Sequence, residues 1–153
     1  MQLGQQRITF KTHIIKMHQI EYIEGKAIRA EALLALYNDA GWTHYSQKPQ
    51  NTIKALERSQ FVFSAWNGAQ LVGMVRVVGD DYSIVFIQDL LVLTAYQKQG
   101  IGSTLLQRTL EKYQSADKII LLADEDPKLR KFYEKQGLKD IQSLDMMSFI
   151  KLK

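Results

Sequence analysis

Two glycines, Gly100 and Gly102, stand at the start of an apolar helical pattern, and this turn has the residue types of an anion-binding site. Ser103 and Thr104 lie in the expected first turn, which contains no acid. A helix N-terminus carries unpaired N–H groups and a partial positive charge, and glycine lets an anion approach them closely. Lys98 adds a positive charge nearby. The turn therefore indicates a phosphate or pyrophosphate site, unless it is only a sharp strand-to-helix connection.

Two common phosphate-binding motifs fit this turn poorly. A P-loop ends in Gly-Lys-Ser/Thr, whereas Gly102-Ser103-Thr104 contains no lysine. The dinucleotide-binding fingerprint requires a third small residue, and Leu105 stands at that position. The glycines alone therefore leave the kind of ligand open.

A second candidate is Asp89, the carboxylate within the apolar segment FIQDLLVL. Burying a carboxylate is costly unless it is paired or reached by water in a cleft. Burial also raises the pKa of a carboxyl group in general, towards the range useful to a general base. The alternative is a structural ion pair, with Arg76 on the preceding strand as the partner.

The composition narrows the classes of function. The 153 residues suit a single domain, 1–153, with one core. The net charge of +4 is spread along the chain, and Lys128 to Lys131 is interpreted as an exposed helix face, so we expect no nucleic-acid partner. The absence of cysteine excludes disulfides, thiolate metal sites and a cysteine nucleophile.

Metal and membrane classes are not indicated either. His13, His18 and His44 have no metal-ligand spacing, so we predict no metal, and no serine–histidine–acid set is suggested. No apolar run has the character of a signal peptide or a membrane span, so we expect no membrane association and a cytoplasmic location. Residues 1–12 are polar and are expected to be loosely ordered.

Periodicity predicts the elements that position these residues. Strands are expected at 17–23, 61–66, 71–78, 82–93 and 118–123, helices at 27–40, from 49, at 100–114 and at 127–137, and one or two final strands within 139–153. Asn67-Gly68 predicts a tight turn, and Asp126 with Pro127 predicts a helix start. A strand, the glycine turn, a helix and a strand form a βαβ unit, whereas the other strands are expected to be antiparallel. The predicted class is α+β with a mixed sheet.

Two segments resemble a known family. LLVLTAYQKQGIGSTLL resembles motif A of the GNAT superfamily of N-acetyltransferases, whose pattern Gln/Arg-x-x-Gly-x-Gly/Ala is matched from Gln97 to Gly102. ADEDPKLRKFYEKQGL resembles motif B through Phe132-Tyr133 and Gly137-Leu138. The motifs occur in the family's order and at its separation. The resemblance implies a GNAT fold with six or seven strands, about four flanking helices, and a splayed parallel pair at the centre of the sheet.

The resemblance also implies acetyl-CoA as co-substrate and transfer of its acetyl group to an amine. Backbone N–H groups of residues 99–103 would bind the pyrophosphate, and residues 91–93 would pair with the pantetheine arm. The implied cofactor-binding residues are Leu91, Val92, Leu93, Gln97, Lys98, Gln99, Gly100, Ile101, Gly102, Ser103, Thr104, Asp126, Phe132 and Tyr133. Asp126 departs from the asparagine of many members, and helix capping is its alternative role.

The implied chemistry assigns two catalytic residues. An amine attacks a thioester only when neutral, yet an alkylamine has a pKa of ~10.4, so a base or a water chain must remove its proton. By the resemblance, Tyr133 is the general acid for the CoA thiolate, with a core tyrosine as its alternative. Asp89 is the candidate base, and the alternative is that it only orients the acceptor.

The acceptor site is expected near the loop NDAGWTHYSQ, which carries Trp42, His44 and Tyr45. Trp42 and Tyr45, with Arg76 and Asp89, are the candidate substrate-binding residues, although both aromatics could equally pack on the sheet. DAGW, VVGDD and IQDLLVL faintly resemble the plant and cyanobacterial arylalkylamine (serotonin) acetyltransferase branch. That branch would imply an arylalkylamine or polyamine, a small-molecule acceptor.

Other hypotheses stay open at this point. The fold could serve a non-catalytic module that binds or senses acyl-CoA, or the glycine turn could belong to another class of nucleotide-binding domain. A homodimer is also conceivable, because the final strands within 139–153 could pair across a two-fold axis.

Overall fold

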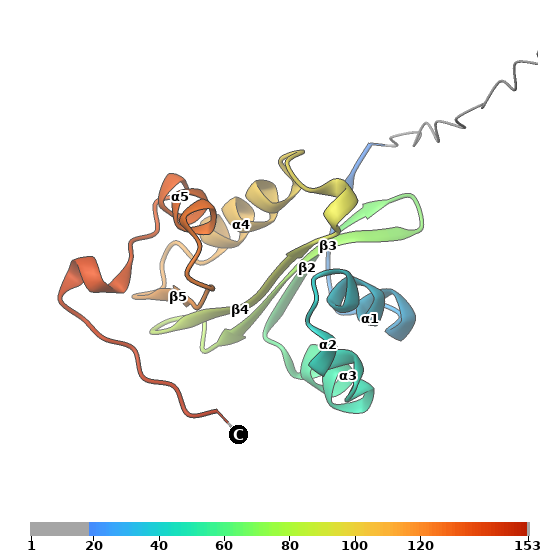
Figure 1. The fold of residues 1–153 in the computed structure, drawn as a ribbon, viewed down its shortest axis with the longest axis horizontal. Helices are drawn as coiled ribbons and strands as arrows, with labels where there is room; N and C mark the ends of the chain where they lie inside the picture. The colour runs from blue at the N-terminus through green and yellow to red at the C-terminus, as the bar shows by residue number, and fades with distance from the viewer. Residues whose placement is uncertain (1–18, 153) are drawn as a thin grey trace, which may run out of the picture.

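The computed structural model describes residues 19–152 and builds them around one sheet (Figure 1). In chain order the elements are β1 (Glu21–Glu24), α1 (Ala30–Asp39), α2 (Thr43–Ser46), α3 (Pro49–Arg58), β2 (Phe61–Asn67), β3 (Gln70–Gly79), β4 (Val85–Val92), the 3-10 helix η1 (Thr94–Tyr96), α4 (Ile101–Lys112), β5 (Ile119–Leu121), α5 (Pro127–Lys135) and the 3-10 helix η2 (Ile141–Leu144). The strands follow one another across the sheet as β1-β2-β3-β4-β5. The first three pairings are antiparallel and β4–β5 is parallel, which confirms the mixed α+β class.

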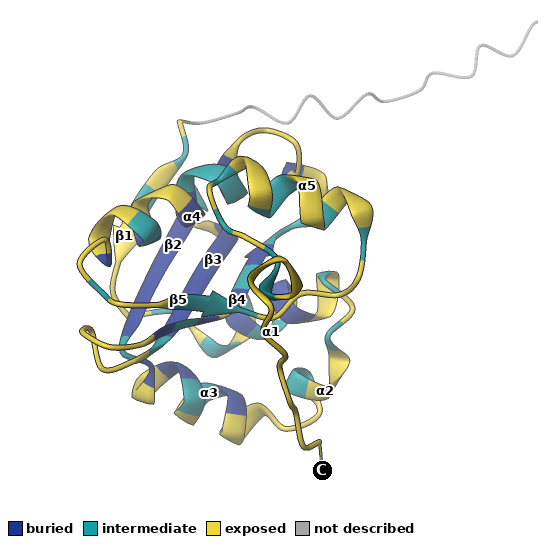
Figure 2. Cartoon of the chain, turned by 90° about the vertical axis from the view of Figure 1, so that its left-hand side faces the viewer, coloured by how far each residue is buried: buried dark blue, intermediate teal, exposed yellow. Residues whose placement is uncertain are grey.

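Helices cover both faces of this sheet, and each face has its own apolar core. Figure 1 shows α4 and α5 on one side and α1, α2 and α3 on the other. The predicted apolar stripe of α4 is confirmed, because Ile101, Leu105, Leu106 and Tyr113 are buried against β2, β3 and β4. On the opposite face α1 and α3 bury residues of their own against the sheet. The central strands are consequently the most deeply buried part of the chain (Figure 2).

β4 carries one extra residue, Gln88, relative to its partner strand. Arg76 pairs with Asp89 and the next residue, Val77, pairs with Ile87, so Gln88 forms a β-bulge. Side chains alternate between the two faces of a strand, and the extra residue reverses that alternation. Ile87 therefore packs in the core beneath α4, whereas Asp89, two positions later, faces α1.

The expectation of six or seven strands is wrong for the part of the chain that the structure describes, which has five. Instead of final strands, residues 139–152 contain η2 followed by a segment without secondary structure. The cause is local: the Asp140 carboxylate accepts a hydrogen bond from the Gln142 N–H and caps a helical turn where the pattern favoured a strand. Beyond that turn, residues 145–152 form no strand and pair with none of the described strands.

The parallel pair lies at the edge of the described sheet and not at its centre, because no strand flanks β5 on its outer side among residues 19–152. The predicted strand 82–93 begins only at Val85. The Asp80 carboxylate accepts the backbone N–H groups of Tyr82, Ser83 and Ile84 and so holds those residues in a turn. The first strand is Glu21–Glu24, and the start predicted for it at Met17 lies outside the described residues, as do residues 1–12.

Candidate functional site

The glycine turn enters α4 through alternating backbone conformations. Gly100 is the N-cap residue with φ 84°, and Lys98 has φ 61°, while Gln99 between them has a negative φ. Such alternation turns successive N–H groups towards one side and forms an anion-binding concavity. No side chain caps α4 and its first turn contains no acid. The predicted helix start is therefore confirmed, and its free N–H groups remain available to an anion.

Three polar side chains of the turn bind the turn's own backbone. Gln97 Nε2 donates to the carbonyl of Val92 at 3.1 Å, and Gln99 Nε2 donates to the carbonyl of Ala95 at 3.2 Å. The Thr104 hydroxyl donates to the Gly100 carbonyl at 3.1 Å. These bonds hold the turn in shape, so Gln97, Gln99 and Thr104 offer a ligand mainly their backbone groups.

Gly102 brings the two predicted motifs into contact. A Cβ atom at this position would lie 3.6 Å from Val92 Cγ2 and 3.9 Å from Phe132 Cζ, which are ordinary contact distances. Phe132 of α5 and Val92 at the end of β4 therefore stand beside the start of α4. Ser103 is half-buried next to them, and the Ile101 side chain is buried in the core, so Ile101 too presents its backbone.

Half of β4 has a strand on one side only. Its pairing with β5 covers Val85 to Ile87 and ends at the Gln88 bulge. Beyond the bulge β4 pairs with β3 alone as far as Val92, and within residues 19–152 no strand pairs with its other edge. Alternate N–H and C=O groups of that edge point away from β3. Leu91 and Val92 thus lie along an open strand edge, on which the Val92 carbonyl accepts a hydrogen bond from Gln97 Nε2. The N–H of Leu93 donates to the Val72 carbonyl of β3, and η1 then connects the strand to the glycine turn.

Tyr133 is half-buried next to Phe132, with the ring centroids 5.1 Å apart. Burial raises the pKa of the Tyr133 hydroxyl, so the group is protonated at neutral pH. The ring lines a hollow of about 610 Å³ between β5, the residues after it and the chain beyond α5. Asp126 lines the same hollow, and its carboxylate caps α5 by accepting the Lys128 N–H at 2.7 Å. The capping alternative for Asp126 is thus present.

Asp89 belongs to a buried polar network on the α1 face of the sheet. Its Oδ2 accepts from Arg76 Nε at 2.5 Å and from the Tyr37 hydroxyl at 2.6 Å. Arg76 also donates to the Ser59 hydroxyl at 3.2 Å. Asp89 is 1% exposed and Arg76 is 6% exposed, so the ion pair considered from the sequence is present and deeply buried. Burial and the Asp89 charge raise the pKa of Tyr37, which therefore acts as a donor.

The aromatic residues that follow α1 stack above this network, and two of them, His44 and Tyr45, lie in the short helix α2 where the sequence led us to expect a loop. Tyr45 lies 4.3 Å from Tyr37 between ring centroids, 4.1 Å from His44 and 6.0 Å from Trp42. Trp42 and Tyr45 are half-buried and pack on the second core, whereas His44 is exposed. Burial, and then the charge of Asp89, raise the pKa of Tyr45. The structure therefore brings Trp42, Tyr45 and the Arg76–Asp89 pair together on one side of β4.

A sequence profile of the family described as "Acetyltransferase (GNAT) domain" matches residues 18–151. The chain belongs to the GNAT acetyltransferase family. The glycine turn and the Phe132-Tyr133 pair, which carried the resemblance in the sequence, lie side by side in this GNAT domain.

Relatives agree with this family membership. An uncharacterized N-acetyltransferase of Prochlorococcus marinus is 29% identical over 67% of this chain and 58% of its own length. A probable N-acetyltransferase of Mycobacterium tuberculosis is 38% identical over 48% of this chain and 45% of its own length. The chain thus spans about half the length of these curated relatives. A solved GNAT-family acetyltransferase of Streptococcus pneumoniae is 33% identical, covers 88% of this chain and 98% of its own, and has a TM-score of 0.80.

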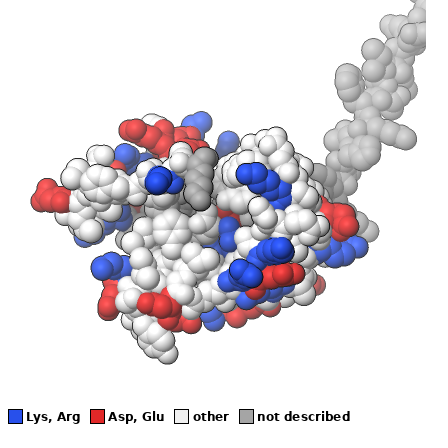
Figure 3. Space-filling model, turned by 90° about the horizontal axis from the view of Figure 1, so that it is seen from below, with Lys and Arg blue, Asp and Glu red and all other residues white. Residues whose placement is uncertain are grey.

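Neither surface charge nor metal-ligating side chains mark a further site among the described residues. On the face seen in Figure 3, Lys and Arg alternate with Asp and Glu over a mostly uncharged surface. Within residues 19–152 no group of three or more His, Asp or Glu side chains could hold a metal ion. His13 and His18 lie outside those residues. No helix of the described part is long and apolar enough to cross a membrane.

Sequence reasoning missed two residues of the site. Tyr37 has the spacing of the apolar face of α1, so nothing in the sequence marks its hydroxyl as the donor to Asp89. Gln88 looks like any polar residue in a strand, because a bulge depends on how two strands pair and not on one residue type. Within this network, Asp89 could be recognised from the sequence because it is the single acid in an apolar segment.

Proposed function

We propose that this protein transfers an acetyl group from acetyl-CoA to a primary amine. One observation carries the proposal: the open edge of β4 is followed, after η1, by a glycine turn whose helix has free N–H groups and no acid in its first turn. An extended chain bearing a pyrophosphate at one end fits that combination, because the edge can pair with amides and the turn can bind the anion. Acetyl-CoA has these two parts in this order.

The residues of the turn and of β4 suit acetyl-CoA as co-substrate. The N–H groups of residues 99–103 would bind the pyrophosphate and Lys98 would add charge, while the backbone of Leu91 to Leu93 would pair with the amides of the pantetheine arm. Gly102 leaves room for close approach beside Phe132. Asp126 would contribute the helix start that its Oδ1 caps, and its Oδ2 could accept an amide N–H of the pantetheine arm.

Tyr133 is proposed as the general acid. The attacking neutral amine forms a bond to the acetyl carbon, the C–S bond breaks, and the departing thiolate takes the proton of the Tyr133 hydroxyl. The proton that the amine nitrogen loses passes to water, from which the Tyr133 hydroxyl is restored. The raised pKa of Tyr133 keeps that proton in place at neutral pH. The position of the residue next to Phe132, which stands at the start of α4, supports this assignment.

Asp89 is proposed to orient the acceptor side of the site, and its role as the base remains a prediction. Oδ2 is occupied by Arg76 and Tyr37, and Oδ1 is buried without a hydrogen-bond partner among the described residues. This geometry favours the positioning role, in which Asp89 fixes Tyr37 beneath Tyr45 and Trp42. Those rings would receive an amine with an aromatic or aliphatic body.

The test is calorimetric titration with acetyl-CoA of the parent chain and three glycine variants. Gly102→Ala adds a methyl group that the fold accepts at 3.6 Å, so any loss of binding reflects the ligand. Gly100→Ala adds a methyl group and left-handed strain, and Gly41→Ala is its control, because Gly41 has φ 76° and lies outside the turn.

We expect Gly102→Ala and Gly100→Ala to weaken binding about 10- to 100-fold, the worth of one hydrogen bond to a charged group, and Gly41→Ala to leave it unchanged. No binding by the parent chain would refute the proposal. Equal weakening by Gly100→Ala and Gly41→Ala, with binding by Gly102→Ala unchanged, would show that backbone strain and not ligand contact is the cause. Displacement of acetyl-CoA by NAD or ATP at similar concentrations would favour another class of nucleotide-binding domain.

A further inference from the structure

Helix α1 ends at Asp39, and its last turn contains no basic residue. The C-terminus of a helix carries a partial negative charge, so a carboxylate at this position is unfavourable for the helix itself. The carboxylate instead contacts a distant element: its Oδ2 accepts the Thr94 N–H at 2.7 Å and the Thr94 hydroxyl at 2.9 Å. A residue that opposes the local preference of its own helix is expected to serve such a contact.

Thr94 is the first residue of η1, the short helix that connects β4 to the glycine turn. The N-cap residue of η1, Leu93, has no side-chain group that could cap it, and none does so locally. Asp39 therefore supplies the cap of η1 from another element, 55 residues away in the chain.

The other two residues of η1 connect it to the sheet and to the glycine turn. The Tyr96 hydroxyl accepts from Asn67 Nδ2 at 2.9 Å and donates to Gln70 Oε1 at 3.0 Å, which anchors η1 on the β2–β3 hairpin. The Ala95 carbonyl accepts from Gln99 Nε2 at 3.2 Å. Since Gln99 directly precedes the N-cap residue of α4, the position of η1 is passed on to the glycine turn.

The end of α1 holds β4 at two points. The Tyr37 hydroxyl donates to Asp89 at 2.6 Å, and Asp39, two residues later, accepts from Thr94. These two contacts, which we call the α1 clamp, lie at either end of residues 90–93. That stretch of β4 pairs with β3 alone, and its free edge is the one proposed for acetyl-CoA. The clamp thus supports the part of the strand that has a neighbouring strand on one side only.

We propose that Asp39 is a positioning residue of the acetyl-CoA site, which sets the path from β4 to Gly100 by capping η1 from α1. The inference rests on the proposed function in naming acetyl-CoA as the ligand. Asp39 need not touch the cofactor, because η1 transmits its effect through the bond between the Ala95 carbonyl and Gln99.

The same contact ties the two sides of the site together. Tyr37 and Trp42 belong to the proposed acceptor side, and the Trp42 N–H donates to the Tyr37 carbonyl at 3.0 Å. Asp39 lies between these two residues in the chain. The end of α1 therefore holds the acceptor side and the glycine turn in a fixed relation to each other.

A carboxylate could also affect an anion-binding turn through its charge alone, and the two roles predict opposite results. A negative charge repels a pyrophosphate, so its removal would strengthen binding. Loss of a positioning contact weakens binding. Asp39→Asn separates the two effects further, because asparagine caps a helix as well as aspartate does but carries no charge.

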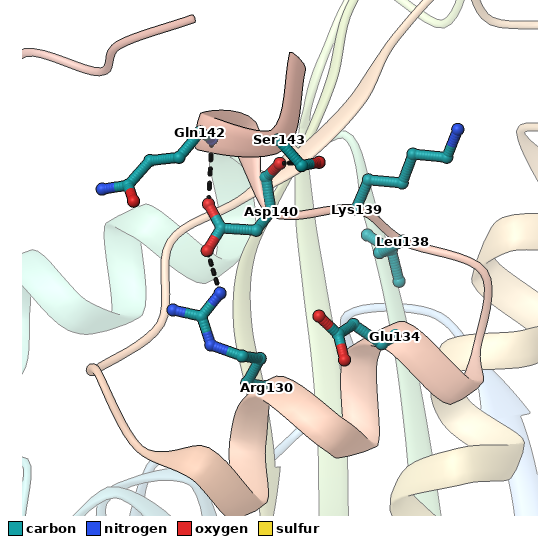
Figure 4. A pocket seen from close by; sticks show the side chains of 7 residues that line it. All are labelled: Arg130, Glu134, Leu138, Lys139, Asp140, Gln142 and Ser143. Carbon is teal, nitrogen blue, oxygen red and sulfur yellow. Dashed lines mark hydrogen bonds and ion pairs between the residues drawn. The ribbon is translucent and has the colours of Figure 1, made fainter. Parts of the chain in front are cut away.

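The test is calorimetric titration with acetyl-CoA of the parent, Asp39→Ala, Asp39→Asn, Thr94→Val and the double variant Asp39→Ala/Thr94→Val. Asp140→Ala is the matched control. Figure 4 shows the Asp140 carboxylate accepting the Gln142 N–H and contacting Arg130, so it also caps a 3-10 helix, but that helix is η2, beyond α5. Asp39→Ala removes an unfavourable charge from α1 together with the η1 cap, so urea unfolding should show little change in stability.

We expect Asp39→Ala to weaken acetyl-CoA binding about 10-fold, within the range of about 2- to 30-fold typical of residues that act through others. Asp39→Asn and Asp140→Ala should bind as the parent does. The double variant should bind no more weakly than Asp39→Ala, because both changes remove the same contact. Unchanged or stronger binding by Asp39→Ala, or additive losses in the double variant, would overturn the proposal.

Hydrogen exchange of the chains without ligand gives a second, independent measurement. Backbone amides of residues 94–103 should exchange faster in Asp39→Ala than in the parent, and those of the rest of the sheet should not. Asp140→Ala should leave residues 94–103 unchanged. Unaltered exchange at the turn, or faster exchange throughout the chain, would show that Asp39 does not position the turn. If the parent binds no acetyl-CoA, the proposed function fails, and this measurement still decides the role of Asp39.

Discussion

The buried ion pair beneath the acceptor side gives the sharpest prediction about stability. Arg76→Met removes a guanidinium that is 6% exposed and leaves Asp89, which is 1% exposed, with the Tyr37 hydroxyl as its remaining donor. An uncompensated buried charge typically lowers the free energy of unfolding by about 3–5 kcal/mol. Since a domain is stable by only about 5–15 kcal/mol, this loss should lower the melting temperature by about 10 °C.

The assay is urea unfolding followed by tryptophan fluorescence. Arg130→Met is the matched control, because Arg130 also pairs with a carboxylate, that of Asp140, but its side chain is 47% exposed. We expect a loss of no more than about 1 kcal/mol for that surface pair. Arg76→Met combined with Asp89→Leu should recover much of the loss, since no charge then remains buried.

Two results would refute this reasoning. One is an Arg76→Met chain within about 1 kcal/mol of the parent, or no less stable than Arg130→Met. The other is a double variant whose loss equals the sum of the two single losses, because contacting residues in one network should not behave additively. Either result would mean that water or a local shift satisfies Asp89 when Arg76 is absent.

Three further predictions concern Tyr133, Asp126 and Asp80. Tyr133→Phe should lower kcat for amine acetylation about 100- to 10,000-fold, while calorimetry should show unchanged acetyl-CoA binding. Because burial raises the pKa of Tyr133, the kcat of the parent should show no loss from deprotonation of this group up to about pH 10. Unchanged turnover in Tyr133→Phe would show that Tyr133 takes no part in the chemistry. Asp126→Ala should lower the free energy of unfolding by about 1 kcal/mol through loss of the α5 cap, and Asp126→Ser should restore most of it, as urea titrations of both would show. Hydrogen bonds from the Ser83 hydroxyl and from the N–H groups of Ile84, Tyr82 and Ser83 hold the pKa of Asp80 well below its ordinary value, so the stability that it contributes is present above about pH 4 and is lost as the pH falls further. The difference in melting temperature between the parent and Asp80→Asn should accordingly shrink in acid, and a constant difference would contradict the assignment.

Local signals in the sequence were enough to locate several elements of the fold. Gly100 marks the start of α4 because the N-cap residue takes a left-handed conformation there. Asp126 and Pro127 mark the start of α5 because one caps it and the other needs no N–H partner. Asn67-Gly68 marks the β2–β3 hairpin because Gly68 adopts the positive φ that a tight hairpin turn requires. Each of these features depends on residues adjacent in the chain.

Features that depend on distant residues were not readable. The ion pair of Asp89 with Arg76 could be named only as one alternative, because choosing it requires the register of β3 on β4. The prediction of final strands within 139–153 was wrong because alternation of apolar and polar residues indicates that a segment can form a strand but does not identify the strand with which it would pair. The place of β5 at the edge of the sheet follows from the same missing partner.

The single extra residue, Gln88, reverses which side chains of β4 face each side of the sheet. Before it, odd-numbered side chains enter the layer beneath α4, and after it the even-numbered Leu90 and Val92 do so. Removing that one residue would send Asp89 into an all-apolar layer and expel Leu90 towards α1. Insertions and deletions should therefore be tolerated in the loops around this strand and rejected within it, because there a change of one residue exchanges the two sides of the molecule.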